Sequence, residues 1–311
     1  MELKEMMNKL LDATIFFSFD RSGYRRHCPE PLQLVDLTGQ RGLVTGASKG
    51  IGWAVANKLI GQGMQTILIA RETSSIKNLL PPEKATLSTS FDLDLSLLKK
   101  VYAFAQDQVT QPLDVLVHNA GSMPDQLTLT SEGIELCFAL QVLAPFILTK
   151  TLAEQGKLAK NCRIIFVSSG GMYLKKLDLS DLTYSHTKYN KYSCYANVKR
   201  AQVILAKQFA SRYPDYLFSA MHPGWVKTAG VEQAMPTFNK LLNKRLRLPE
   251  QGADTILWLA TGQKYENGQF WFDRKHASTT FFHCNRSSLE DKQKLWQLCE
   301  NQLERLKLES L

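Results

Sequence analysis

The chain has 311 residues, of which 44% are hydrophobic and 22% charged, so it is long enough to bury one large core. No run of about 18 apolar residues is apparent, and we therefore expect no membrane-spanning helix. The net charge of +9 is spread along the chain, which argues against a nucleic-acid interface and fits an anionic small molecule better.

The N-terminal segment has apolar residues at helical spacing, followed by a phenylalanine cluster. We expect this face to pack on the body of the protein; contact with a membrane surface or with a partner subunit are the alternatives. We interpret residues 1–38 as an N-terminal helical extension. The residues of this face are Met6, Met7, Leu10, Leu11, Ile15, Phe16, Phe17 and Phe19.

Residues 45–52 read T-G-A-S-K-G-I-G between an apolar stretch and a helical pattern. Gly46 can adopt the backbone of a tight turn, Gly50 lets a pyrophosphate approach, and Gly52 lets the helix pack closely on the strand. Free amides at the helix N-terminus would then face phosphate groups. The alternative is a turn that only reverses the chain.

Strand and helix patterns alternate along the rest of the chain. This alternation predicts an α/β fold with a doubly wound, Rossmann-type, seven-stranded parallel sheet and helices on both faces. The main domain should span residues 39–285, and residues 286–311 should form a C-terminal helix. After the strand that ends at Val44, we predict strands at 66–70, 85–91, 113–117, 163–167, 216–221 and 269–272. The predicted helices cover 97–104, capped by Ser96, and 132–158, 193–211 and 253–259.

The six cysteines have neither a C-x-x-C spacing nor a Cys/His cluster, so we expect no metal site and no disulfide framework. A reducing compartment is the better fit. We expect a cytoplasmic protein, with peripheral membrane contact as the variant.

Tyr195 and Lys199 form Y-A-N-V-K, and a spacing of four places both on one helix face. Tyr184 and Lys188 have the same spacing. Position favours the first pair, because Tyr195 begins an apolar-periodic segment, whereas Tyr184 lies in a polar stretch typical of a loop.

From about Arg41 to Asp273, the chain resembles the short-chain dehydrogenase/reductase family, within it the member 12-like branch. The family motifs occur in order: T-G-A-S-K-G-I-G at Thr45, D-L at Asp94, N-A-G at Asn119, V-S-S-G-G at Val167, Y-A-N-V-K at Tyr195 and H-P-G-W-V-K-T at His222. The branch features are S-G-Y at Ser22, M-H-P-G-W at Met221, G-V-E-Q-A-M-P at Gly230, Q-G-A-D-T at Gln251 and W-F-D-R-K ending at Lys275.

The resemblance implies an oxidoreductase in which Tyr195 exchanges a proton with an alcohol or carbonyl substrate. A free tyrosine has a pKa of about 10, and Lys199 together with the cationic ring of the cofactor would lower it toward 7. Ser169 would hold the substrate oxygen; Ser168 is the alternative.

Two positions depart from the family pattern, and one of them, Gln141, matters for catalysis. Where relatives have an asparagine that helps to hold a proton-relay water, this chain has Gln141, which would complete the catalytic set in a working relay. The alternative is a slowed relay, or a nucleotide-binding sensor or scaffold without turnover. His118 also replaces a usual asparagine, and we assign it no role.

The charge near the adenosine ribose predicts NADP(H), with NAD(H) less favoured. Arg71 follows the second strand, where an acidic residue would repel a 2′-phosphate, and Lys49 lies in the glycine turn. Asp92 and Leu93 are a shifted alternative to Asp94 and Leu95 at the adenine. The predicted cofactor contacts are Gly46, Ser48, Lys49, Gly50, Ile51, Gly52, Arg71, Asp94, Leu95, Asn119, Ala120, Gly121, Tyr195, Lys199, Pro223, Gly224, Val226 and Thr228.

The substrate is expected to be a small alcohol or carbonyl compound. The long connection after Ser169 carries Met172, Tyr173 and Leu174, which we place at the substrate entrance. Residues 238–248 mix apolar and basic side chains where the family keeps a lid, which indicates an apolar or lipid-like substrate met at a membrane surface; a lid packed on its own pocket is the alternative. The resemblance also suggests a homo-oligomer, with an N-terminal segment that blocks the assembly surface as the alternative.

Overall fold

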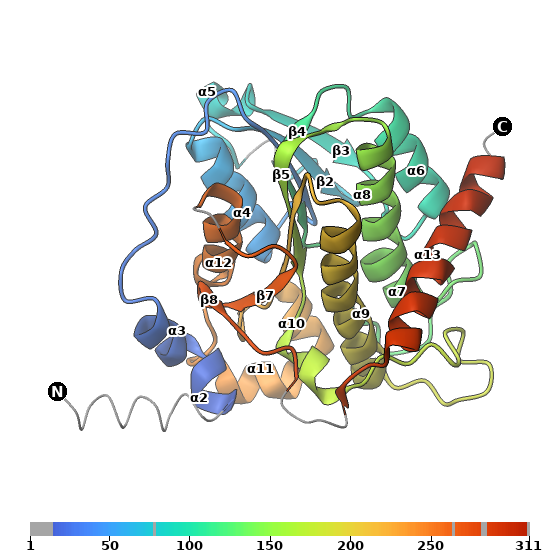
Figure 1. Ribbon diagram of the computed structural model, residues 1–311. Coiled ribbons are helices and arrows are strands. Elements are labelled where there is room, and N and C mark those ends of the chain that lie inside the picture. The colour runs from blue at the N-terminus through green and yellow to red at the C-terminus, as the bar shows by residue number, and fades with distance from the viewer. Residues whose placement is uncertain (1–14, 77–78, 263–264, 281–284, 310–311) are drawn as a thin grey trace.

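The computed structural model of the protein describes residues 15–76, 79–262, 265–280 and 285–309. Eight strands form one sheet in the order β3-β2-β1-β4-β5-β6-β7-β8 (Figure 1). The order reverses direction between β1 and β4, which creates a switch point at the carboxyl ends of these strands. The strands are β1 Arg41–Thr45, β2 Gln65–Ala70, β3 Ser88–Asp92, β4 Leu113–His118, β5 Leu158–Val167, β6 Leu217–Met221, β7 Gln269–Phe272 and β8 Lys275–His276.

The first seven strands pair in parallel, as predicted from the alternation of elements. The predicted strand number was one too low, because β8 adds a short antiparallel edge to β7. The turn between them contains Asp273 and Arg274, which have φ of 48° and 60°. Two successive positive φ values are typical of a tight hairpin, but Asp-Arg lacks the glycine that usually indicates one in a sequence.

Helices cover both faces of the sheet (Figure 1). α4 and α12 pack together on one face, and α6, α8 and α9 lie on the other, with α13 outside them. The helices are α2 Ile15–Phe19, α3 Arg21–His27, α4 Gly50–Gly61, α5 Pro82–Ala85, α6 Leu98–Asp107, α7 Leu136–Phe138, the π-helical turn η2 Ala139–Leu143, α8 Ala144–Glu154, the 3₁₀ turn η3 Gly170–Leu174, α9 Lys191–Arg212, α10 Ala229–Ala234, α11 Pro236–Leu242, α12 Pro249–Thr261 and α13 Leu289–Glu309.

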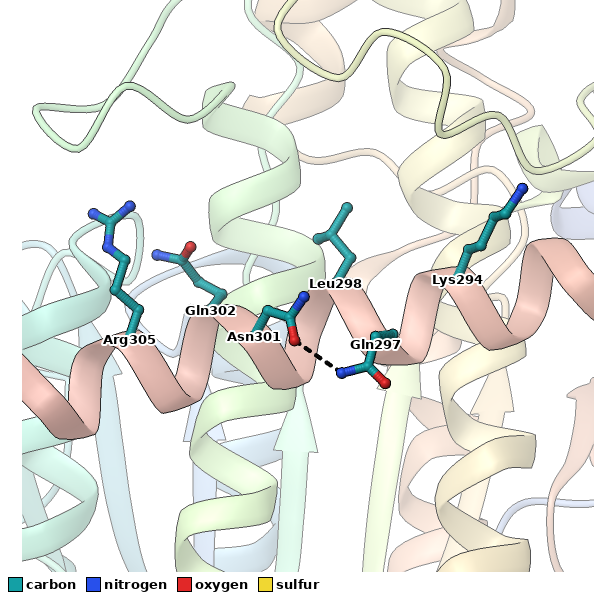
Figure 2. A pocket seen from close by; sticks show the side chains of 6 residues that line it. All are labelled: Lys294, Gln297, Leu298, Asn301, Gln302 and Arg305. Atoms are coloured by element: carbon teal, nitrogen blue, oxygen red, sulfur yellow. Dashed lines mark hydrogen bonds between the residues drawn. The ribbon is translucent and has the colours of Figure 1, made fainter.

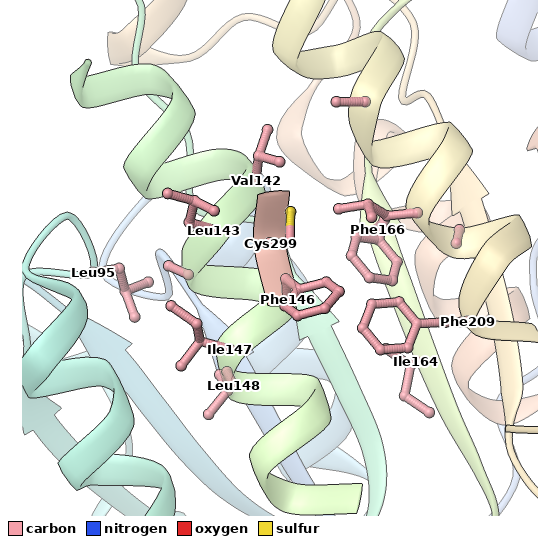
Figure 3. Close-up of a cluster of buried hydrophobic side chains, with 14 of the residues drawn as sticks. Leu95, Val142, Leu143, Phe146, Ile147, Leu148, Ile164, Phe166, Phe209 and Cys299 are labelled. Carbon is pink, nitrogen blue, oxygen red and sulfur yellow. The ribbon is translucent and has the colours of Figure 1, made fainter. Parts of the chain in front are cut away.

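An aromatic core connects α8, β5 and α9 (Figure 3). The Phe146 ring lies 5.3 Å from that of Phe209 and 4.9 Å from that of Trp296, which belongs to α13. Burying each such side chain stabilises the fold by about 2–3 kcal/mol. The C-terminal helix is therefore packed on the main core.

Several predicted boundaries differ from the observed ones; the fifth strand, for example, already begins at Leu158, and two other differences have clear local reasons. The third strand starts at Ser88 because α5 occupies the residues just before it. Ser96 does not cap α6: its hydroxyl donates to the Asp94 carboxylate at 2.7 Å, and Leu97 is the N-cap. Asp94 thus draws Ser96 into a turn of its own.

The helix predicted at 132–158 is shorter and interrupted. It runs as α7, η2 and α8 and ends at Glu154; Gly156, with φ of 67°, then turns the chain into β5. Contrary to the sequence-based expectation, the stretch Leu136–Glu154 is long and apolar enough to cross a membrane. Most of it is buried inside the fold, as in a core helix.

The N-terminal extension contains α2 and α3 within the described residues. Asp20 separates them and caps α3 by accepting bonds from the amides of Ser22 and Gly23. Phe19 is buried, as its place in the predicted apolar face requires. Met6, Met7, Leu10 and Leu11 lie outside the described residues, as do the side chains of Ile15 and Phe16.

Candidate active site

The glycine turn has the backbone that its sequence predicts. Gly46 and Gly50 have φ of 66° and 59°, which disfavours larger residues. A Cβ on Gly52 would lie 2.2 Å from the Gly46 carbonyl oxygen, so α4 can approach the strand only through glycine. Ser48 is half-buried in this turn, and Ile51 contacts α12.

Hydrogen bonds of Asn119 connect this turn to the end of β4. Its side-chain amide donates to the Thr45 carbonyl at 2.9 Å, and the backbone amides of Asn119 and Ala120 both donate to the Thr45 hydroxyl. A Cβ on Gly46 would lie 2.9 Å from the Ala120 Cα. The predicted residues on either side of the switch point are therefore in direct contact.

The start of α4 suits an anionic group. Lys49 is its N-cap and makes no side-chain cap hydrogen bond, so the first amides of this twelve-residue helix are not satisfied by a capping side chain. Thr228 borders the same place: a Cβ on Gly50 would lie 3.2 Å from its methyl carbon. The residues present thus fit a pyrophosphate.

Tyr195 and Lys199 lie on one face of α9, beside the end of β5. The Lys199 Nζ lies 5.4 Å from the centre of the Tyr195 ring and donates to the Val167 carbonyl at 2.8 Å. A Cβ on Gly171 would lie 3.6 Å from the Ser169 Oγ and 3.8 Å from a carbon of the Tyr195 ring, so the serine hydroxyl lies beside this tyrosine, and it acts to lower the pKa of the phenol. The three residues predicted as catalytic are therefore brought together at the carboxyl edge of the sheet.

In the protein without a cofactor, the pKa of Tyr195 is raised, whereas the sequence-based argument expects it to be lowered. Burial raises it to about 12, against the lowering effect of the nearby Ser169 hydroxyl. Burial also lowers the pKa of Lys199 to about 7. This lysine is 3% exposed, and its hydrogen bond goes to the backbone carbonyl of Val167 rather than to a carboxylate. It therefore supplies only a weakened positive charge to the phenol.

Lys199 should make stability depend on pH. Between its folded pKa of about 7 and its ordinary value of 10.5, the unfolded chain binds a proton that the folded chain lacks. The free energy of unfolding should therefore rise with pH, by about 1.4 kcal/mol per unit from this residue, and Lys199→Met should lose this contribution. Urea denaturation of both proteins from pH 7 to 10 measures the difference; parallel curves would contradict the lowered pKa.

Gln141 lies in the π-helical turn and is fully buried. Its amide nitrogen donates to the Ser122 carbonyl at 2.9 Å, while its Oε1 has no hydrogen-bond partner among the described residues. A Cβ on Gly121 would lie 2.9 Å from this Oε1 and 3.7 Å from the Lys199 Nζ. An orphaned buried acceptor thus faces the lysine side of the site, where a bridging water could bind.

The rival residues have other partners. Ser168 is buried and donates to the Lys199 backbone carbonyl at 2.8 Å, so its hydroxyl is directed away from the phenol. Tyr184 lies in a loop, with φ of 55°. His118 bonds the Thr149 hydroxyl at 2.7 Å, and burial lowers its pKa to about 3, so it is a neutral, satisfied histidine.

Contacts within the protein bring together only some of the residues that were predicted to bind the adenosine. Arg71 and Lys49 are both exposed. Leu95 and Ala120 line one small cavity at the switch point. Asp94 accepts from Ser96, whereas Asp92 accepts from the Thr73 amide at 2.8 Å and so holds the loop after β2.

The turn after β6 packs closely on Arg247. Gly224 has φ of 76°, and a Cβ there would lie 2.4 Å from Arg247 Nε, so this arginine by itself already favours glycine at this position. Pro223 also accepts from the same guanidinium. Val226 packs under α12, where a Cβ on Gly252 would lie 2.6 Å from it.

The expected substrate entrance is largely closed by packing. Met172 and Tyr173 are buried, and only Leu174 of the three is exposed, at 74%. In the predicted lid, Leu241 is exposed beside Lys240, whereas Leu246 and Arg247 are buried. The basic face of this segment is thus divided between solvent and the interior.

Sequence spacing gave no signal for one cluster near Tyr195. Glu135, Cys137 and Cys194 place their ligand atoms within 4.8 Å of one another in the interior. Both Glu135 oxygens accept from backbone amides at the start of α7, and the Cys137 thiol donates to the Ser122 carbonyl. A hydrogen bond with Cys194 and burial raise the pKa of Cys137. These contacts stabilise the start of the long helix.

A second, open and shallow surface site lies on the outer face of α13 (Figure 2). Its lining residues all belong to that helix, and Gln297 donates to Asn301 across it at 2.8 Å. It includes none of the catalytic candidates. The chemistry therefore belongs to the sheet edge described above.

A glycine turn at the switch point of a parallel sheet, beside a helix-borne tyrosine and lysine, defines the class of nucleotide-binding α/β oxidoreductases. The family model described as short chain dehydrogenase matches residues 41–237. The chain belongs to the short-chain dehydrogenase/reductase family.

Two relatives and two solved structures are among the proteins to which this chain is similar. The chain is 37% identical to Dehydrogenase/reductase SDR family member 12 of Homo sapiens, over 84% of this chain and 86% of that protein. It is 31% identical to Polyprenol dehydrogenase of Danio rerio, over 75% and 78%. A crystal structure of an uncharacterised protein from Mycobacterium paratuberculosis has a TM-score of 0.69 at 23% identity, covering 88% of this chain and 96% of that one.

The second structure is described as an NAD(P)-dependent gluconate 5-dehydrogenase from Beutenbergia cavernae with bound NADP. It has a TM-score of 0.59 at 22% identity, and covers 76% of this chain and 95% of that one. At this identity both structures support the fold alone.

Proposed function

We propose that this protein is an NADP(H)-dependent oxidoreductase that acts on an alcohol or carbonyl group, with Tyr195 as the acid/base. The observation that supports this most directly is the grouping of Ser169, Tyr195 and Lys199 beside the glycine turn. The nicotinamide, when bound, supplies or accepts the hydride. The amides at the start of α4 would hold its pyrophosphate.

The residues of this chain divide the remaining work. Ser169 orients the substrate oxygen toward the phenol, and Tyr195 donates its proton to that oxygen in reduction or removes it in oxidation. Lys199 and the Gln141 Oε1 lie beside Gly121, and a water between them would connect the phenol to solvent. Gln141 then serves as the relay residue.

A panel of carbonyl compounds, assayed for NADPH consumption, tests the proposal. Turnover that depends on Tyr195 supports catalysis. Tight NADPH binding without turnover on a broad panel would favour the alternative, a nucleotide-binding sensor or scaffold with the same fold.

Cofactor preference should follow the charge of Arg71. With Arg71 and Lys49 exposed at the carboxyl side of the sheet, a 2′-phosphate gains charge-assisted hydrogen bonds that a plain ribose does not. We expect Arg71→Asp to lower kcat/KM for NADPH by roughly 10- to 100-fold and to raise the relative use of NADH. Steady-state kinetics with both cofactors measure this; an unchanged preference would contradict the assignment.

We also propose an apolar substrate met at an anionic membrane surface. Leu241 and Leu248 are 77% and 45% exposed; exposed Lys240 directly precedes Leu241, and exposed Lys244 lies between the two leucines. Similarity to a protein named polyprenol dehydrogenase is consistent with such a substrate. The protein should sediment with anionic liposomes at low salt and dissociate at high salt; absence of binding would remove the membrane contact.

A further inference from the structure

The residues at the end of α2 and the start of α3 pack against two turns of the candidate active site. The Phe19 ring, 5% exposed, fills the space beside Gly170, the residue after Ser169: a Cβ on Gly170 would lie 2.5 Å from it. The same ring contacts that of His222 with 4.4 Å between centroids. Phe19 therefore packs against the serine turn and the start of the turn after β6 at once.

The main chain of this segment makes a second connection. The Phe19 carbonyl accepts from the Trp225 amide at 2.8 Å and from the Arg247 Nε at 3.0 Å. A Cβ on Gly224 would lie 2.7 Å from that carbonyl oxygen. Gly170 and Gly224, next to Ser169 and Pro223, therefore both make room for the N-terminal segment.

A buried ion pair holds the segment in place. Arg247 is fully buried and donates to the carbonyls of Ser18, Phe19 and Asp20. Its Nη2 pairs with the Asp273 carboxylate at 2.8 Å. His27, at the end of α3, bonds the same carboxylate at 2.7 Å. One guanidinium thus connects the segment to the turn after β7 and to Pro223.

We propose that residues 17–28 form a positioning strap for the active site, in which Phe19 is a positioning residue for the Ser169 and Pro223 turns. The inference rests on the proposed function, in which Ser169 orients the substrate oxygen beside the Tyr195 phenol. If Phe19 no longer supports the Ser169 turn, the turn can move and carry the substrate oxygen away from the Tyr195 phenol. Displacements of about 1 Å at a reacting centre cost roughly 100-fold in rate.

Phe19→Ala, compared with Phe104→Ala, tests the strap. Phe104 is also 5% exposed. It belongs to α6, packs on the Phe91 ring and lies outside the strap. We expect both variants to lower Tm by similar amounts. Only Phe19→Ala should lower kcat, by roughly 10- to 100-fold, with the KM for NADPH changed less than about threefold because the glycine turn lies outside the strap. Phe19→Leu should recover most of the activity.

Equal kcat in the two alanine variants would overturn the proposal. Hydrogen exchange separates this outcome from failure of the proposed function, because it needs no turnover. Peptides covering 169–175 and 222–227 should exchange faster in Phe19→Ala than in wild type, and at the wild-type rate in Phe104→Ala. Unchanged exchange in both peptides would overturn the strap even in an active enzyme. If Phe19→Ala does not fold, Phe19→Val, which retains part of the side chain, takes its place in both measurements, with Phe104→Val as its control.

Discussion

Tyr195→Phe is expected to lower kcat by roughly 10²- to 10⁴-fold, the usual contribution of a positioned acid or base. The substitution removes one hydroxyl and leaves the ring beside Lys199, where the Nζ lies 5.4 Å from its centre. NADPH affinity should therefore stay near the wild-type value. Steady-state kinetics and a fluorescence titration with NADPH measure the two effects separately.

Tyr184→Phe is the matched control, because Tyr184 and Lys188 repeat the spacing of the proposed pair. Tyr184 lies in the loop before α9 and contacts the ring of Tyr189, so its hydroxyl should not affect kcat. Equal loss of kcat in both variants would indicate a general effect on this region. Full activity in Tyr195→Phe would remove the phenol from the mechanism.

Asp273→Asn should lower the free energy of unfolding by about 3–5 kcal/mol, since it leaves a buried guanidinium without its counter-charge. Arg247 is fully buried and directs two nitrogen atoms at this carboxylate. These contacts and the bond with His27 hold the Asp273 pKa below its ordinary value, against the effect of burial. Urea denaturation at pH 7 measures the loss.

Glu290→Gln provides the comparison for that loss. Glu290 pairs with Lys294 on the surface of α13, and exposed pairs contribute about 0–1 kcal/mol. If Asp273→Asn costs no more than Glu290→Gln, the backbone carbonyls around Arg247 are sufficient partners for its charge. The carboxylate would then not be needed to hold the strap.

Sequence periodicity predicted the seven parallel strands because most of them are short apolar runs between turn residues; β3, which reads S-T-S-F-D, is the exception. It failed where two patterns look alike. Residues 132–158 read as one apolar helix, yet Gly156 ends it and Leu158 already belongs to β5. The π-helical turn around Gln141 gives no signal in the spacing of apolar residues. A two-residue strand such as β8 is too short for any periodicity.

The site was predictable where chemistry is local in the chain. The glycine turn and the pair Tyr195 and Lys199 lie within short motifs, and the structure brings them to one edge. Arg247 was interpreted as part of a basic lid, because nothing near it in the sequence shows that its partner is Asp273. The lowered pKa of Lys199 likewise depends on burial by distant segments.

The strap joins residues at opposite ends of the chain, and this has a consequence for biosynthesis. Ser18 and Arg247, which share a hydrogen bond, are 229 positions apart. The N-terminal residues leave the ribosome first but meet their partner only after most of the polypeptide has been made. Maturation of the catalytic pocket should therefore be a late event, and truncated nascent chains that stop before β7 should remain sensitive to proteolysis at their N-termini.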